Sequence, residues 1–149
     1  MNITISVEKF SGYSQWWNDL LSVFANPGDY FEIHCWTKEH QALQLAEQFG
    51  EEACFGMPGL KIIHGTITDH FLRFLLDNER KHHNRFYNKL TPFYTLHIGE
   101  NFSSQDYGTK IVLKCRSLKE KEKIKNLLID NNMNLRIYNT EKQDIWRVI

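Results

Sequence analysis

Segments with two different hydrophobic periods alternate along the chain, and this alternation constrains the fold more than any other feature of the sequence. In residues 2–7 the apolar residues Ile3 and Ile5 alternate with polar ones, as in a strand with one buried face. Residues 16–24 instead repeat apolar side chains at the spacing of one helical face. Both patterns recur to the end of the chain, and the sequence therefore predicts the α+β class, with strands and helices interleaved.

The predicted elements follow the order βαβαβαββαβ. The predicted strands span residues 2–7, 30–36, 60–66, 93–98, 110–115 and 135–138, and residues 146–149 are a candidate for one more short strand. The predicted helices span residues 14–24, 37–49, 68–78 and 117–130. Because the chain has the length of one common domain and contains no repeat, we expect a single α+β domain over residues 1–149. Its simplest form is one mixed β-sheet of about five or six strands packed by about four helices.

Residues that favour helix ends support these boundaries. Thr37 is a predicted N-cap of the second helix, and Gly50 fits the left-handed position that follows the last turn of that helix. Thr68 or Asp69 is the predicted N-cap of the third helix. The fourth helix begins with the segment 117–120, SLKE, which is a capping box: its serine and glutamate side chains each satisfy a backbone N–H.

The last third of the chain contains two predicted supersecondary units. Residues 93–98 and 110–115 resemble the two strands of a hairpin, joined by a long polar loop over residues 99–109. Strand, capped helix and strand over residues 110–138 form a predicted right-handed crossover.

Composition and cysteine usage favour a reduced globular protein. Apolar residues make up 42% of the chain and charged residues 24%, which is ordinary for a globular domain. No stretch approaches the roughly 20 apolar residues of a membrane helix, and the N-terminus lacks the pattern of a secretory signal. Cys35, Cys54 and Cys115 are odd in number and form no C-x-x-C pair, which favours free thiols. We therefore expect a cytoplasmic protein with no membrane partner.

The familiar catalytic and cofactor motifs are absent from the sequence. It contains no Walker loop, no G-x-G-x-x-G, no H-E-x-x-H, no G-x-S-x-G and no paired C-x-x-C zinc pattern. The sequence therefore predicts no cofactor, and it favours a non-catalytic role over an enzymatic one.

One segment supports an alternative function, that of a small hydrolase or phosphoesterase. His64-Gly65-Thr66 matches half of the H-x-T pattern of two-histidine phosphoesterases, in which two histidines act as general base and acid and the hydroxyl groups hold the phosphate. The second histidine would be His97, where Gly99 stands in place of the hydroxyl residue. This alternative assigns catalysis to His64, Thr66 and His97.

The histidines also raise the question of a metal site. His34, His64 and His97 lie on predicted strands, and three convergent imidazoles would suit Zn²⁺. Their spacing does not place them on neighbouring strands or on one face, so the sequence predicts no metal site.

A second alternative is nucleic-acid binding through the basic segment 110–125. Its lysines and arginine outnumber its two glutamates, and such a cluster can contact phosphates. However, the formal net charge of the whole chain is zero, and no RNA-binding or helix-turn-helix pattern accompanies the segment. These features argue against nucleic acid as the partner.

The leading prediction is a non-catalytic protein-binding module. Residues 1–60 contain two lysines and eight acidic residues, so this part of the chain is acidic and the remainder is basic. Acidic groups mixed with aromatic side chains can steer association with a basic protein or block a basic active site. The most concrete form of this prediction is an inhibitor or immunity protein that blocks a cytosol-acting toxin. The residues predicted to bind are Tyr30, Glu32, Trp36, Glu39, Glu51 and Glu52.

Overall fold

The strands with one buried face assemble into a single sheet. The computed structural model describes residues 2–7, 15–54, 56–77, 90–130, 135–139 and 144–148. The strands are β1 (Asn2–Val7), β2 (Tyr30–Trp36), β3 (Glu51–Glu52), β4 (Leu60–Thr66), β5 (Thr95–Ile98), β6 (Phe102–Gln105), β7 (Lys110–Lys114), β8 (Leu135–Asn139) and β9 (Asp144–Val148). The helices are α1 (Gln15–Phe24), α2 (His40–Glu47), α3 (Asp69–Leu75) and α5 (Leu118–Asp130), with a short 3-10 turn, η1 (Asp106–Gly108). The α+β class is thus confirmed.

The sheet is larger and more uniform than predicted. In the described part of the chain, nine strands follow the order β3-β4-β2-β5-β6-β7-β1-β8-β9, and this number exceeds the predicted five or six. Every pairing between these described strands is antiparallel, so the prediction of a mixed sheet is wrong. The short strands β3 and β6, of two and four residues, account for part of the difference, because so few residues carry little periodic signal.

Strand β6 lies inside residues 99–109, where the sequence predicts a polar loop. Phe102 and Ser104 of this strand point into the core, whereas Ser103 and Gln105 do not. Because Ser104 is polar and yet 0% exposed, it hides the two-residue hydrophobic period that would identify the strand. The predicted hairpin is therefore wrong: β5 and β7 each pair with β6 and lie on opposite sides of it.

The N-terminal strand occupies the middle of the predicted crossover. Strands β7 and β8 both pair antiparallel with β1, so they run parallel to each other and are joined by α5. Ile3 and Ile5 of β1 are 0% exposed, because their side chains face the hydrophobic core.

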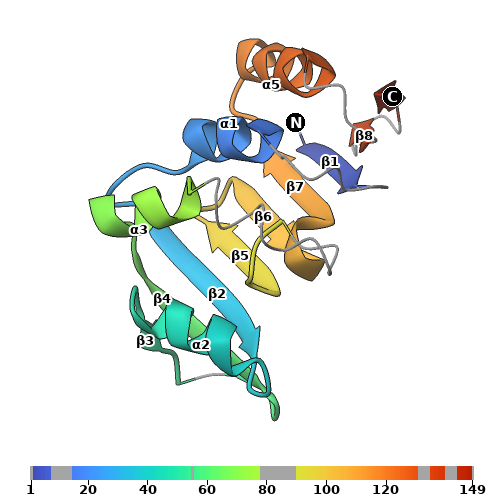
Figure 1. Cartoon of the computed structure of the whole chain (residues 1–149). Coiled ribbons are helices and arrows are strands. Elements are labelled where there is room, and N and C mark those ends of the chain that lie inside the picture. The colour runs from blue at the N-terminus through green and yellow to red at the C-terminus, as the bar shows by residue number, and fades with distance from the viewer. Residues whose placement is uncertain are drawn as a thin grey trace.

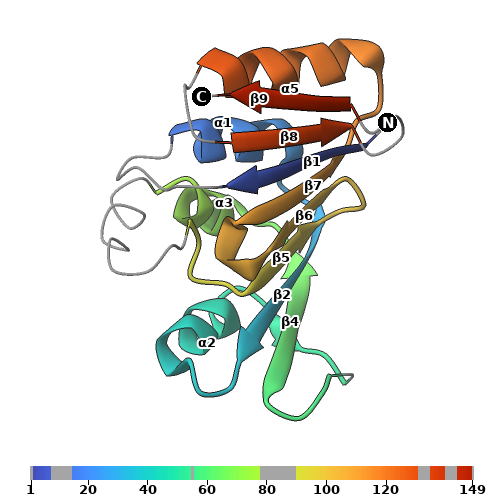
Figure 2. The same ribbon diagram turned by 90° about the vertical axis from the view of Figure 1, so that its right-hand side faces the viewer.

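The four helices that the structure describes pack into one hydrophobic core on one face of the sheet. This core includes Trp16 of α1, Phe31 of β2 and Phe71 of α3, each 0% exposed. Figure 1 shows α1, α2 and α3 along one side of the twisted sheet, and Figure 2 looks onto the strands with α1 and α5 behind them. The opposite face, hereafter the polar face, carries the side chains that alternate with the core residues of each strand.

Two of the predicted helix starts are confirmed. The backbone N–H of Phe71 donates to Oγ1 of Thr68 over 3.1 Å, which caps α3. The N–H of Glu120 donates to Oγ of Ser117 over 3.1 Å, which caps α5. In a usual capping box the glutamate accepts from the backbone N–H of the capping serine. Here the carboxylate of Glu120 accepts instead from the backbone N–H of Arg116, the residue before Ser117.

The predicted ends of the second helix are wrong. Helix α2 begins after Glu39, and the hydroxyl of Thr37 donates instead to the carbonyl of Gly59 over 3.3 Å. Gly50 is not among the residues with positive φ. It is required for a different reason, because a Cβ at this position would lie 2.5 Å from the carbonyl oxygen of His64.

Candidate metal centre

Strand β2 supplies most of the polar side chains of the candidate site. Successive side chains of a strand point to opposite faces, so the pattern of β2 separates into two rows. The core row contains Phe31, Ile33 and Cys35, none more than 1% exposed, and the other row contains Tyr30, Glu32, His34 and Trp36. The second row lies on the polar face of the sheet.

Antiparallel register brings further histidines to this row. Glu32 lies directly opposite His97 of β5 on one side and opposite His64 of β4 on the other. Directly paired residues share a face of the sheet, with their Cβ atoms about 4.5–5.5 Å apart. Glu32 is therefore flanked by an imidazole on each neighbouring strand, and His34 follows two residues later on the same face.

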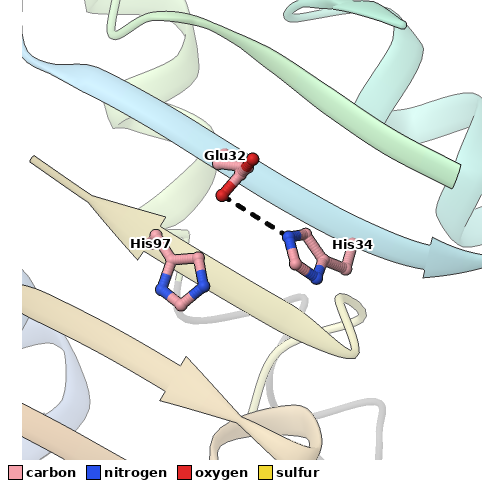
Figure 3. Close-up of side chains that lie close together, drawn as sticks. All are labelled: Glu32, His34 and His97. Carbon is pink, nitrogen blue, oxygen red and sulfur yellow. Dashed lines mark ion pairs between the residues drawn. The ribbon is translucent and has the colours of Figure 1, made fainter. Parts of the chain in front are cut away.

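Glu32, His34 and His97 form a compact cluster. Each offers one ligand atom, and these three atoms all lie within 4.8 Å of one another. Oε2 of Glu32 is 3.5 Å from Nε2 of His34, and the two imidazole rings meet edge to face at 5.5 Å between centroids. Figure 3 shows the carboxylate and both rings converging from β2 and β5. Within the described residues, no other group of His, Cys, Asp and Glu meets this geometry.

The cluster is partly exposed to solvent. The side chains of His34 and Glu32 are 21% and 19% exposed. Nε2 of His34 is itself shielded from solvent, and it forms no hydrogen bond with any described residue. Its contact with Glu32 is an ion pair without a hydrogen bond, and a bound ion is one of the groups that can satisfy such a buried ring nitrogen.

Electrostatics favour the neutral form of one ligand. Burial lowers the pKa of His97, the neighbouring His34 lowers it further, and the carboxylate of Glu32 acts in the opposite direction. A neutral imidazole keeps a lone pair for a metal, so this environment suits a ligand.

The donor set matches known metal chemistry. Two imidazoles and one carboxylate are the protein ligands of catalytic His₂Glu zinc sites, in which a further coordination position stays open. The same ligands form the facial triad of non-haem iron sites. With bonds of about 2.0–2.1 Å, the ligand atoms of a tetrahedral site lie roughly 3.3 Å apart. The 3.5 Å separation of Glu32 and His34 is close to this value.

Four of the six residues predicted to bind a protein partner lie on the polar face. Tyr30, Glu32 and Trp36 share it on β2, and Tyr30 is 46% exposed. Glu51 of β3 lies opposite His64 and therefore belongs to the same face.

The other two predicted binding residues lie elsewhere. The carboxylate of Glu39 accepts a hydrogen bond from the hydroxyl of Tyr107. Glu52 lies opposite Ile63, a core residue, and its Oε2 is 3.7 Å from Nζ of Lys61.

The structure contains only part of the arrangement predicted for the hydrolase alternative. His64 and His97 do share the polar face, but they flank Glu32 from opposite sides, two strand spacings or about 10 Å apart. Thr66 is exposed and lies opposite Tyr30. His64 is outside the metal-ligating cluster.

The basic residues of segment 110–125 lie partly on strand β7 of the sheet and partly on helix α5. Lys110 and Lys114 are exposed on the polar face of β7, whereas Lys119 and Lys123 are exposed on α5. The guanidinium of Arg116 pairs with Glu120 over 3.1 Å.

One sequence signal of the cluster lies outside the familiar metal-binding motifs. Glu32 and His34 are spaced i,i+2 on a predicted strand, so they share a face wherever that strand lies. Of the histidines considered for a metal, His34 and His97 converge and His64 does not. The third ligand of the cluster is the carboxylate of Glu32 rather than the imidazole of His64.

Comparison of the chain with protein-family models, with curated proteins and with solved structures gave no match. Among the described helices, none combines the length and apolar character needed to cross a membrane.

Proposed function

We propose that the protein binds a divalent transition-metal ion, Zn²⁺ foremost, through Glu32, His34 and His97. The convergence of three ligand atoms within 4.8 Å of one another carries this proposal. The carboxylate of Glu32 lies between two strands that carry imidazoles, and such an arrangement is expected to bind a cation. The carboxylate offers two oxygen atoms with lone pairs, and the imidazole nitrogens are good metal ligands.

The surroundings of the cluster also support an ion. Nε2 of His34 is shielded and makes no hydrogen bond with the described residues. Coordination would satisfy this atom and would hold the two rings, which already lie edge to face. Three protein ligands on a partly exposed face would leave room for water or for an exogenous ligand, as in catalytic rather than structural zinc sites.

Metal titration tests this proposal. Isothermal titration with Zn²⁺ in a non-chelating buffer, with metal content after dialysis measured by mass spectrometry, should give one ion per chain. His97→Ala should weaken the affinity by more than about 100-fold, because loss of a ligand exceeds the 10–100-fold effect of losing an outer-shell partner. His40→Ala is the matched control, since His40 is exposed at the start of α2 and lies outside the cluster.

Two results would overturn the proposal. One is an affinity that is the same in the wild type and in folded His97→Ala. The other is a preference for Mn²⁺ over Zn²⁺, because a His₂Glu site follows the opposite order of divalent affinities.

Protein binding by the polar face is the second candidate function, and it corresponds to the predicted inhibitor or immunity role. Tyr30 is 46% exposed on this face, which also carries Glu32 and Glu51, and this combination favours protein binding. Capture of a basic protein should weaken as salt rises, and Tyr30→Ala and Glu51→Lys should abolish it. Glu122→Lys on α5 is the charge-matched control. Capture that is unaffected by either polar-face substitution would exclude this role for the face.

A further inference from the structure

Ser103 of β6 occupies a special position beside the candidate metal centre. It pairs directly with His97 of β5, so both side chains lie on the polar face. In such a pair the Cβ atoms are about 4.5–5.5 Å apart, which places a serine hydroxyl within reach of a neighbouring imidazole. On its other side Ser103 pairs with Val112 of β7, which offers no polar side-chain group.

The hydroxyl of Ser103 is buried without a hydrogen-bond partner among the described residues. Its Oγ is shielded from solvent and forms no hydrogen bond with any described residue. Native proteins pair nearly all such atoms, and an exception therefore calls for an explanation. Of its two direct cross-strand neighbours, only His97 can supply a polar side-chain partner.

A histidine that binds a metal also needs a partner. It coordinates through one ring nitrogen, and the N–H on the other nitrogen almost always donates to a carboxylate, carbonyl or water, which fixes the ring orientation and tautomer. A serine hydroxyl oxygen can accept this hydrogen bond, because it has two lone pairs.

We propose that Ser103 is a positioning residue for the metal ligand His97, and that its Oγ accepts a hydrogen bond from the non-coordinating ring N–H of His97. This inference rests on the proposed metal binding by Glu32, His34 and His97. The cross-strand row through Glu32 and His97 continues directly with Ser103, so the three side chains lie side by side on the polar face.

The test compares three variants of the full chain in Zn²⁺ titrations. Ser103→Ala should weaken the affinity by about 10–100-fold, and Ser103→Thr, which keeps the hydroxyl, should restore most of it. Thr4→Ala removes a hydroxyl residue from the same face of β1, three strands from β5, and should leave the affinity unchanged. The melting temperatures of the metal-free variants show whether the alanine variant is folded.

A spectroscopic readout separates positioning from a merely structural role. In the Zn²⁺ form, proton–nitrogen NMR should show a ring N–H of His97 that exchanges slowly with solvent in the wild type and rapidly in Ser103→Ala. If the wild type binds Zn²⁺ and Ser103→Ala binds it equally well, the role of Ser103 is excluded while the metal site stands. If the wild type binds no Zn²⁺, the metal site and the role of Ser103 fail together.

Discussion

Glu32 lies directly opposite His97 in the antiparallel pairing of β2 with β5, and both side chains project from the polar face of the sheet. His34 joins them because it follows Glu32 by two residues on the same strand. The site thus depends on one local spacing and one long-range register.

Replacing Glu32 by glutamine should remove the anionic ligand without changing the size of the side chain. We expect Zn²⁺ affinity to fall by more than about 100-fold, because the loss of a ligand exceeds the effect of losing an outer-shell partner. Isothermal titration measures this change. Glu51→Gln is the control, since Glu51 lies on the same face but outside the cluster. Equal losses in both variants would indicate a general electrostatic effect rather than coordination.

An exogenous ligand should bind at the open position of the site. The cobalt-substituted protein should show visible absorption bands that shift when azide is added, because three protein ligands leave part of the coordination sphere to solvent. A spectrum that does not respond to azide would indicate a closed, structural site. His97→Ala, loaded under the same conditions, should give only the spectrum of free Co²⁺.

In the metal-free protein, the imidazole of His97 should titrate below about 6.5, the ordinary histidine pKa. Burial and His34 lower this pKa and Glu32 raises it, so Glu32→Gln should lower it further. NMR titration in the presence of a chelator measures both values. An unchanged or higher pKa in Glu32→Gln would contradict this account.

The lowered pKa of His97 also has a consequence for stability. Because the unfolded state binds the proton more readily, the free energy of unfolding should fall as the pH drops from about 6.5 through the lower pKa of the folded state. Above about 6.5 this contribution is fully present. Denaturant unfolding of the wild type and His97→Gln over this range should show a smaller decrease in the variant.

Only one cysteine should react readily in the native protein. Cys54 is exposed, whereas Cys35 and Cys115 are buried. Burial raises the pKa of Cys35 to about 12, with Glu39 and Glu47 acting in the same direction, so its thiol stays protonated and inert at pH 8. A thiol reagent should therefore modify one site in the native state and three in denaturant. Cys54→Ser should remove the native reaction, and a remaining native reaction would contradict the buried placement of the others.

Gly50→Ala should destabilise the protein. The new Cβ would lie 2.5 Å from the carbonyl oxygen of His64, and backbone atoms cannot rotate away as a side chain does. We expect a loss of about 1–3 kcal/mol in the free energy of unfolding, as for other overpacked positions. Urea denaturation measures it, and an unchanged or increased value would contradict the close approach. Zn²⁺ affinity should persist in the folded variant, because His64 is not in the cluster.

The sequence by itself determined the α+β class, the two faces of β2 and the capping residues Thr68 of α3 and Ser117 of α5. These features depend on the hydrophobic period and on hydrogen bonds between residues close in the chain, so a local pattern is sufficient to predict them. The same reasoning missed β6, because the buried side chain of Ser104 gives no hydrophobic signal. It also misplaced the start of α2, where no side chain caps the helix.

Only the tertiary structure decided which strands are neighbours and in which register they pair. Nothing within β2 distinguishes His64 from His97 as the partner of Glu32, and both do lie opposite it. His97 converges with His34 and Glu32, whereas His64 does not. A shift of one residue in the pairing of β5 would turn the imidazole of His97 into the core. The packing of the whole sheet against its helices fixes that register, and through it the composition of the site.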